Sequence, residues 1–262
     1  MNKEELVELM QENDIAPLKR MGQNFIIDKN IVDKMLSTAT KEDIVLEVGP
    51  GLGAITIPLS KIVKRVIAIE MDRKIVKILK DRVGNNVEVI EADILKSSDT
   101  IPQEPYKVFS NTPFYIAPAI IRMFLESANP PTEMVLMTQK EVAERICAKP
   151  PDMNLLALSV QFYATPKVLF RVPRQCFYPV PNVDSSVIRI IVKEKKNGST
   201  FFKVARAGFS RPRAQLLNNL SKGLKLDKVE VEKHLKSIGL DPKIRAERLS
   251  IDNWVELSNL LQ

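Results

Sequence analysis

The 262-residue chain is predicted to be an α/β protein, with a doubly wound parallel sheet, an antiparallel edge hairpin and a small all-helical C-terminal domain. Three observations predict this class. Up to residue 193, short apolar runs alternate with helical stretches, as in strand–helix–strand units. Two late apolar runs have no helix between them, which indicates an antiparallel hairpin. Beyond the charged linker KEKKNGST, residues 193–200, every segment has helical periodicity.

The first domain, expected over residues 1–193, begins with two helices. Residues 3–12 place Leu6, Leu9 and Met10 on one helical face, and residues 29–39 form the second helix. The strands that follow are short and apolar, as expected of buried strands. They are predicted at residues 44–48, 66–70, 87–91, 108–110, 134–138, 156–164 and 187–192. Helices are predicted between them at residues 54–63, 73–83, 117–127 and 139–148.

The second domain, expected over residues 200–262, is helical throughout. Asp227 and Ser250 precede two of its helices as N-caps, and Gly239 ends one. Trp254 lies on the apolar face of the last helix and is expected in the core. The predicted helices are residues 200–207, 212–221, 227–237, 242–246 and 251–261.

Positive charge is concentrated in this second part. The chain has 39 Lys and Arg against 32 Asp and Glu, and the whole excess lies in residues 193–262. A localised basic region predicts a polyanionic partner, whose phosphates it attracts without reading sequence. The alternative is the solvated surface of a basic helical bundle. The candidate contacts are Arg206, Arg211, Arg213, Lys222 and Lys225.

The rarer residue types exclude several classes of protein. There is one histidine, His234, and there are two cysteines, Cys147 and Cys176, without a CxxC motif. A disulfide framework, a metal site and catalysis by a histidine base are therefore not expected. No apolar run of about 18 residues occurs, and the acidic, amphipathic N-terminus differs from a secretory signal. We expect a cytoplasmic monomer without a membrane partner.

A glycine-rich turn, VLEVGPGLGAIT at residues 45–56, follows the first strong strand and precedes a helix. Gly49, Gly51 and Gly53 allow positive φ and close approach of a ligand to the backbone. Pro50 removes a donor that a pyrophosphate could use, which favours a nucleoside ligand without phosphates, such as S-adenosyl-L-methionine. The alternatives are a dinucleotide, because the turn also satisfies G-x-G-x-x-A, and a tight turn without a ligand.

Acidic residues mark the next two strand ends. Glu70 ends one strand, where a carboxylate can accept both hydroxyls of a ribose. Asp93 follows the next strand, in EADIL, and could accept a hydrogen bond from the adenine amino group of the same ligand. Taken alone, Asp93 could instead be a helix N-cap or a turn residue.

The fourth strand end carries the motif NTPF, residues 111–114, which suits transfer to an aromatic amine. Such an amine is a poor nucleophile because its lone pair is delocalised into the ring. The side-chain carbonyl of Asn111 and the backbone carbonyl of Thr112 could accept its two N–H groups. Pro113 would fix the turn, and Phe114 would stack on a flipped-out base. The alternative is a turn with a buried Phe114.

This chemistry depends mainly on proximity to a methyl donor and needs no strong base. It is therefore compatible with a chain whose single histidine is remote from the motif. Methylation of a pyrimidine carbon requires a thiolate, and neither cysteine lies in NTPF. The motif thus favours methyl transfer to the exocyclic amine of adenine.

From about Leu18 to the C-terminus, the sequence resembles the ribosomal RNA adenine dimethyltransferase family. The resemblance implies a Rossmann-like methyltransferase domain and a helical C-terminal domain. The chain departs from the usual family motifs by Thr112 and Phe114 in place of Leu and Tyr, and by Pro212 and Ala214 in a stretch that usually carries Arg-Arg-Lys. Eight blocks occur in the family's order: KRMGQNFIID, LEVGPGLGAIT, VIAIEMD, EADIL, NTPFYIAP, QKEVAERICAKP, FYPVPNVDSSVIRI and RAERLSIDNWVEL.

The resemblance also implies site residues and an activity. Asn24 and Ile26 join Gly49, Glu70, Asp93 and Asn111 as contacts of S-adenosyl-L-methionine. The implied activity is dimethylation of the N6 amine of two adjacent adenosines in a small-subunit ribosomal RNA hairpin near the 3′ end. The partners would be ribosomal RNA and the assembling small subunit.

Three other functions are weighed against this one. The first is a large-subunit methylase that confers antibiotic resistance. The second is a noncatalytic RNA-binding assembly or transcription factor on the same scaffold. A dinucleotide oxidoreductase is disfavoured, because NTPF and Pro50 have no purpose there.

Overall fold

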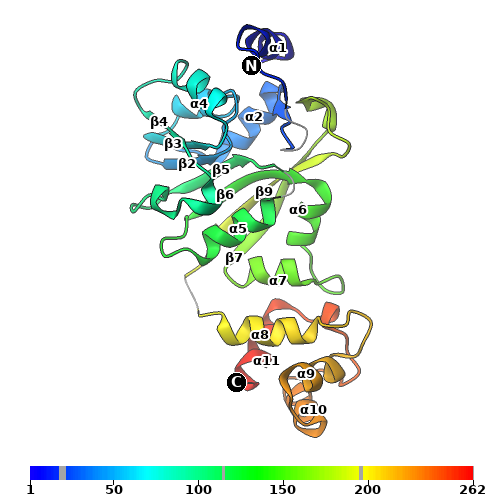
Figure 1. The fold of residues 1–262 in the computed structure, drawn as a ribbon. Coiled ribbons are helices and arrows are strands. Elements are labelled where there is room, and N and C mark those ends of the chain that lie inside the picture. Colours follow the sequence, from blue (N-terminus) through cyan, green and yellow to red (C-terminus); the bar gives the residue numbers. More distant parts are fainter. Residues whose placement is uncertain (18–21, 114–115, 195–196, 262) are drawn as a thin grey trace. The chain divides into compact units, whose positions relative to one another are not determined.

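The computed structural model describes residues 1–17, 22–113, 116–194 and 197–261. The chain divides into two compact units (Figure 1). Unit 1 comprises Met1–Ala143 with Lys167–Val192, and unit 2 comprises Glu144–Pro166 with Lys193–Gln262. The division at residue 193 coincides with the charged linker. The predicted first domain, residues 1–193, differs from unit 1 in one segment: Glu144–Pro166 belongs to unit 2. The alternation of strands and helices in the sequence gives no sign of this.

Seven strands form the main sheet, in the order β4-β3-β2-β5-β6-β9-β7. Neighbours from β4 to β6 are parallel, and β9 is antiparallel to β6. The predicted doubly wound sheet with an antiparallel edge is therefore confirmed. The strands are β2 (Ile44–Val48), β3 (Arg65–Glu70), β4 (Val87–Glu91), β5 (Lys107–Asn111), β6 (Glu133–Gln139), β7 (Ala164–Val172) and β9 (Ser185–Val192).

The order of the chain reverses in the middle of this sheet. Strand β2 lies between β3 and β5 and is buried along its whole length, as expected of a strand covered on both faces. In open α/β sheets, ligands bind beyond the carboxyl ends of the strands at such a reversal. The glycine turn follows β2 and Asn111 ends β5, so both lie where the topology predicts a ligand.

Helices cover both faces of the sheet (Figure 1). Aspartates fix the start of two of them. The Asp28 side chain accepts the N–H groups of Asn30 and Ile31, and that of Asp72 accepts the N–H of Lys74. The helices are α1 (Lys3–Glu12), α2 (Lys29–Met35), α3 (Thr56–Ser60), α4 (Arg73–Lys80), α5 (Ala117–Glu126) and α6 (Lys140–Ile146). Short 3-10 turns lie at Leu36–Thr38, Ile94–Lys96, Ser98–Thr100 and Arg174–Cys176.

A second, smaller sheet joins two segments that are far apart in the sequence. Strands β1 (Phe25–Ile26) and β8 (Phe177–Tyr178) are antiparallel, with Phe25 opposite Tyr178 and Ile26 opposite Phe177. The N–H of Ile27 extends the pairing by donating to the carbonyl of Cys176 over 2.9 Å. This sheet fixes the backbone that leads into α2.

Unit 2 is a helical bundle around its own apolar core. Asp227 and Ser250 are N-caps and Gly239 has φ +74° just after a helix, as predicted. Trp254 is fully buried, 5.4 Å from the ring of Phe209, which confirms its place in the core. The helices are α7 (Leu155–Gln161), α8 (Ser199–Gly208), α9 (Leu216–Leu224), α10 (Lys228–Ser237) and α11 (Ile251–Leu260), with a 3-10 turn at Ala246–Arg248. None of the described helices is long and apolar enough to cross a membrane.

The strand predicted at residues 156–164 is wrong over most of its length, because this run forms helix α7. Asn154 caps the helix by accepting the N–H of Ala157 over 3.0 Å. The buried side chains of Ala157 and Leu158 then join the core of unit 2. A short apolar run suits a buried helix as well as a buried strand, so periodicity alone cannot separate them.

Candidate active site

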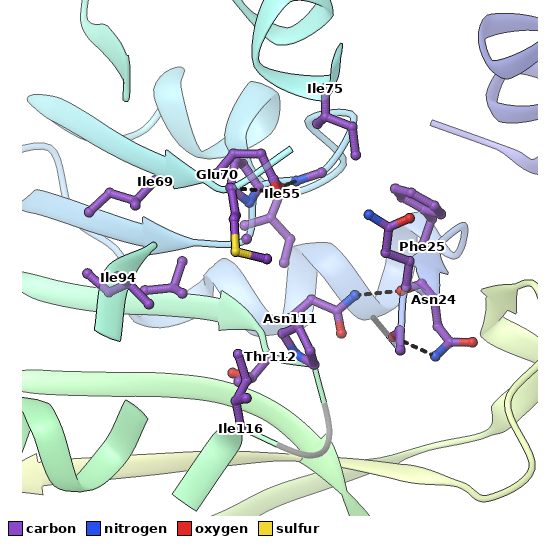
Figure 2. A pocket seen from close by; sticks show the side chains of 18 of the residues that line it. Asn24, Phe25, Ile55, Ile69, Glu70, Ile75, Ile94, Asn111, Thr112 and Ile116 are labelled. Carbon is purple, nitrogen blue, oxygen red and sulfur yellow. Dashed lines mark hydrogen bonds between the residues drawn. The ribbon is translucent and has the colours of Figure 1, made fainter. Parts of the chain in front are cut away.

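A cavity of about 310 Å³ lies at the carboxyl ends of β2 to β5. Its walls come from the glycine turn, the ends of three further strands and the segment that precedes α2 (Figure 2). The structure therefore brings together residues that the sequence places in five separate motifs. The predicted site residues that line it are Asn24, Ile26, Gly49, Gly51, Glu70, Asp93, Asn111, Thr112 and Pro113.

The three predicted turn glycines have different roles. All have positive φ, +67° for Gly49, +54° for Gly51 and +90° for Gly53. A Cβ on Gly49 would meet nothing within 4 Å, and one on Gly51 would lie 3.1 Å from the ring of Phe25. Gly53 does not line the cavity; a Cβ there would lie 2.8 Å from Leu79 of α4. Gly53 thus serves turn geometry and helix packing.

Glu70 is held rigidly at the end of β3. One carboxylate oxygen accepts the N–H groups of Met71 and Asp72 over 2.8 and 3.0 Å, and the other accepts the N–H of Gly51 over 3.3 Å. Burial raises the pKa of Glu70, and these hydrogen bonds oppose that effect. The carboxylate connects the glycine turn to the strand end, so a ligand that binds one of them also meets the other.

Glu47, in the middle of β2, is a buried carboxyl that the sequence patterns did not single out. It is 1% exposed, and neither oxygen has a hydrogen-bond partner among the described residues. Its pKa is raised to about 8, chiefly by burial and to a smaller extent by the charge of Glu70, while the nearby Thr56 hydroxyl acts in the opposite direction. Glu47 is therefore mainly neutral at pH 7. An acid within the apolar run IVLEV was the available signal.

Asp93 is a capping residue, as the alternative interpretation predicts, and it also lies at the cavity. Its side chain caps the 3-10 turn Ile94–Lys96 by accepting the N–H of Leu95 over 3.1 Å. It also lines the cavity. The capping turn thus holds the carboxylate beside the cavity, where an oxygen can meet a ligand amine.

Apolar side chains that the motifs did not predict complete the walls. Met71 and Leu95 are 49% and 41% exposed although both are large and apolar, and each lies within two residues of an acidic site residue. Phe25, Ile55, Ile75 and Ile94, which are buried, also line the cavity (Figure 2). Exposed apolar side chains in the lining of a cavity suit the faces of a planar ring.

Asn111 and Thr112 are fixed at the end of β5. The amide nitrogen of Asn111 donates to the backbone carbonyl of Asn24 over 2.9 Å. The Thr112 hydroxyl is buried and donates to Ser110 over 2.9 Å, and Ser110 in turn donates to the carbonyl of Val48 over 2.7 Å. The Thr112 side chain thus forms its hydrogen bond within the protein, and the role expected of this residue at the site belongs to its backbone carbonyl. Phe114, also predicted for the site, lies outside the described residues.

The predicted basic residues lie on α8, α9 and the adjoining turns of unit 2. All five are exposed, and within the described part of the chain none of them forms an ion pair. Asn219 holds the turn between these helices by donating to the carbonyls of Gly208 and Arg211 over 2.6 and 2.9 Å. A second hollow in this unit, not predicted, is lined by Asp241, Lys243, Ile244, Arg245 and Arg248.

Comparison with known proteins identifies relatives along nearly the whole chain. Two proteins named ribosomal RNA small subunit methyltransferase A are similar. That of Dehalococcoides mccartyi (strain CBDB1) is 42% identical over 95% of this chain and 90% of its own. That of Clostridioides difficile (strain 630) is 41% identical, over 97% and 94%.

Solved structures have the same fold. A dimethyladenosine transferase from Plasmodium falciparum matches with a TM-score of 0.79 and 27% identity, covering 89% of this chain and 95% of the other. The 23S rRNA methyltransferase ErmE matches with a TM-score of 0.76 and 23% identity, covering 91% and 99%. A family model described as ribosomal RNA adenine dimethylase matches residues 18–262. The chain therefore belongs to the ribosomal RNA adenine dimethylase family.

Proposed function

We propose that the chain transfers methyl groups from S-adenosyl-L-methionine to the N6 amine of adenosines in small-subunit ribosomal RNA. The observation that carries this proposal is the convergence of Glu70, Asp93 and Asn111 on one cavity beside the glycine turn. Each of these side chains would present an oxygen to a different group: the ribose of the cofactor, the adenine of the cofactor, and the amine of the target base. The names of the similar bacterial proteins support the small subunit as the source of the RNA.

The lining of the cavity fits S-adenosyl-L-methionine better than a dinucleotide. Among the described lining residues the only charged side chains are acidic, Glu70 and Asp93. Acidic walls suit a sulfonium cation, whereas a pyrophosphate requires donors or cations. Glu70 would hold the ribose hydroxyls, Asp93 the adenine amine, and Met71 and Leu95 the faces of the ring. This composition also argues against the oxidoreductase alternative.

The bound cofactor supplies an electrophilic methyl group, and the chain supplies alignment. The side-chain oxygen of Asn111 and the backbone oxygen of Thr112 accept the two N–H groups of the target amine. These bonds draw the nitrogen lone pair out of conjugation with the ring. Because the methylated nitrogen is more acidic, no strong base is needed, and none of the described lining residues is a histidine or lysine.

Binding of the RNA is assigned to unit 2. Arg206, Arg211, Arg213, Lys222 and Lys225 are exposed and would contact phosphates without reading sequence. Arg245 and Arg248, which line the second hollow, add positive charge to the same unit. The substrate is the assembling small subunit in the cytoplasm, and the target is two adjacent adenosines in a hairpin near the 3′ end of its RNA.

The test is methyl transfer from labelled cofactor to purified small subunits that lack the modification, with primer extension to locate the sites. We expect label in small-subunit RNA at two neighbouring adenosines. Label confined to large-subunit RNA would establish the resistance-methylase alternative instead. No cofactor binding in calorimetry, together with no transfer to either subunit, would favour a noncatalytic assembly factor.

A further inference from the structure

The side-chain amide of Asn111 has a defined orientation. Its nitrogen donates to the backbone carbonyl of Asn24 over 2.9 Å, and the amide oxygen lies on the other branch of the group (Figure 2). We infer that the Asn24 carbonyl positions Asn111, holding its amide oxygen toward the target amine. This inference rests on the acceptor role proposed above for Asn111.

The direction of the amide decides whether Asn111 can act as an acceptor. A carboxamide presents an acceptor on one side and two donors on the other, and the two arrangements have nearly the same shape. A reversed amide would point N–H groups at the N–H groups of the substrate. A backbone carbonyl can only accept, so the Asn24 oxygen selects the arrangement in which the nitrogen faces it.

Strand β1 holds this carbonyl in place. The Asn24 side chain donates to the carbonyl of Gly22 over 2.9 Å, and the next two residues pair with β8. Phe25 packs on the glycine turn, because a Cβ on Gly51 would lie 3.1 Å from its ring. The short strand therefore contacts the turn assigned to the cofactor, and the residue just before it orients the amide assigned to the base.

Asn111→Asp tests the orientation separately from the acceptor role. The substitution keeps the shape and an acceptor oxygen, but its ionised form cannot donate to Asn24. Glu70 and Asp93 are the titratable groups among the described lining residues, and their charges raise the pKa of a new carboxyl there. Only the protonated carboxyl can replace the amide, by donating to Asn24 with one oxygen and accepting with the other.

We expect the ratio of the variant's kcat to the wild-type kcat to rise as the pH is lowered from 9 to 6. Above the pKa of the new carboxyl, that ratio falls about tenfold per pH unit, as the protonated fraction does. The KM for the cofactor stays within a few-fold of wild type. A ratio that is flat with pH, whether the variant is active or inactive, would overturn the inference.

Asn129→Asp is the matched control. The Asn129 amide also donates to backbone carbonyls, those of Pro102 and Gln103 over 2.7 and 3.1 Å, but it does not line the cavity. This variant removes the same kind of bond, so it should lower stability while its kcat ratio stays flat with pH. A slope equal to that of Asn111→Asp would show that the pH effect reflects stability rather than amide orientation.

A second readout needs no activity. With ¹⁵N-labelled asparagine, the Asn111 side-chain signal, identified by its loss in Asn111→Asp, should exchange with water more slowly than signals of exposed asparagines. Exchange as fast as theirs would contradict the bond to Asn24. Full activity of Asn111→Ala would instead refute the proposed acceptor role, so the two failures are distinguishable.

Discussion

The cavity of unit 1 and the basic surface of unit 2 are constructed in opposite ways. In the cavity, polar side chains are tied to the backbone: Glu70 accepts three N–H groups and Asn111 donates to Asn24. On the surface, Arg211 and Arg213 are exposed and, within the described part of the chain, form no ion pairs. Fixed groups suit a reaction that needs alignment, whereas unpaired charges suit a partner held in many geometries. Single substitutions should therefore have large effects in the cavity and small ones on the surface.

The largest effect is expected for Asn111→Ala. Removing a hydrogen-bonding group that acts at the reacting atoms lowers kcat by about 100- to 1,000-fold. The Kd of the cofactor, measured by calorimetry, should change by only a few-fold, because Glu70 and Asp93 remain. A variant with wild-type kcat would contradict the role of Asn111 at the target amine. Equal losses of cofactor binding and turnover would contradict the assignment of Asn111 to the target amine and of Glu70 and Asp93 to the cofactor.

Glu70→Gln should mainly affect cofactor binding. The amide loses the negative charge and keeps only one acceptor oxygen, so its NH2 group must face either the N–H of Gly51 or those of Met71 and Asp72, all of which the carboxylate accepts. Leaving such groups unpaired costs about 1–3 kcal/mol, so the Kd of the cofactor should rise about 10- to 100-fold. Glu91, opposite Glu70 on β4 but exposed, provides the matched control, and Glu91→Gln should leave this Kd unchanged.

Glu47→Gln should change how stability depends on pH. The folded-state pKa is raised from 4.5 to about 8, so between these values the folded protein keeps a proton that the unfolded chain releases. The free energy of unfolding of the wild type therefore falls as the pH rises through this window. The variant lacks this loss, so its melting temperature should exceed that of the wild type by several degrees at pH 8.5. At pH 5 the gap should close, and an equal gap at both pH values would contradict the buried acid.

The smallest effect is expected for Arg213→Ala. Loss of one phosphate contact should raise the KM for RNA only a few-fold, leave kcat unchanged and reduce the salt dependence of binding by about one unit of slope. Lys77→Ala, which removes another exposed charge, on α4 of unit 1, serves as the control and should leave the slope unchanged. Equal slopes for both variants would show that unit 2 has no special role in holding RNA.

Much of unit 1 could be predicted because each of its main strands appears in the sequence as a short, local apolar run. The runs at 44–48 and 87–91 match β2 and β4 residue for residue. Glu70, Asp93 and Asn111 could be placed together because parallel strands end at one edge. The pairing of β1 with β8 could not be foreseen, since it joins residues 25–26 to 177–178 without a local pattern. Only the family resemblance pointed to Asn24 and Ile26.

Two further differences have physical reasons. Gly53 was assigned to the ligand because the motif contains it, but its lack of a side chain is required by Leu79. The contiguous apolar residues at 156–164 predict a strand, but the cap by Asn154 and packing in the core of unit 2 favour helix α7. Stacking by Phe114 and contact of the five basic residues with RNA stay predictions.

The most direct test is the count of N6,N6-dimethyladenosine in small-subunit RNA, measured by mass spectrometry of its nucleosides. Unmodified small subunits would be incubated with S-adenosyl-L-methionine and either the wild-type chain or Asn111→Ala. The account predicts two dimethyladenosines per RNA with the wild type and almost none with the variant. No dimethyladenosine with the wild type, or equal amounts with both, would contradict it.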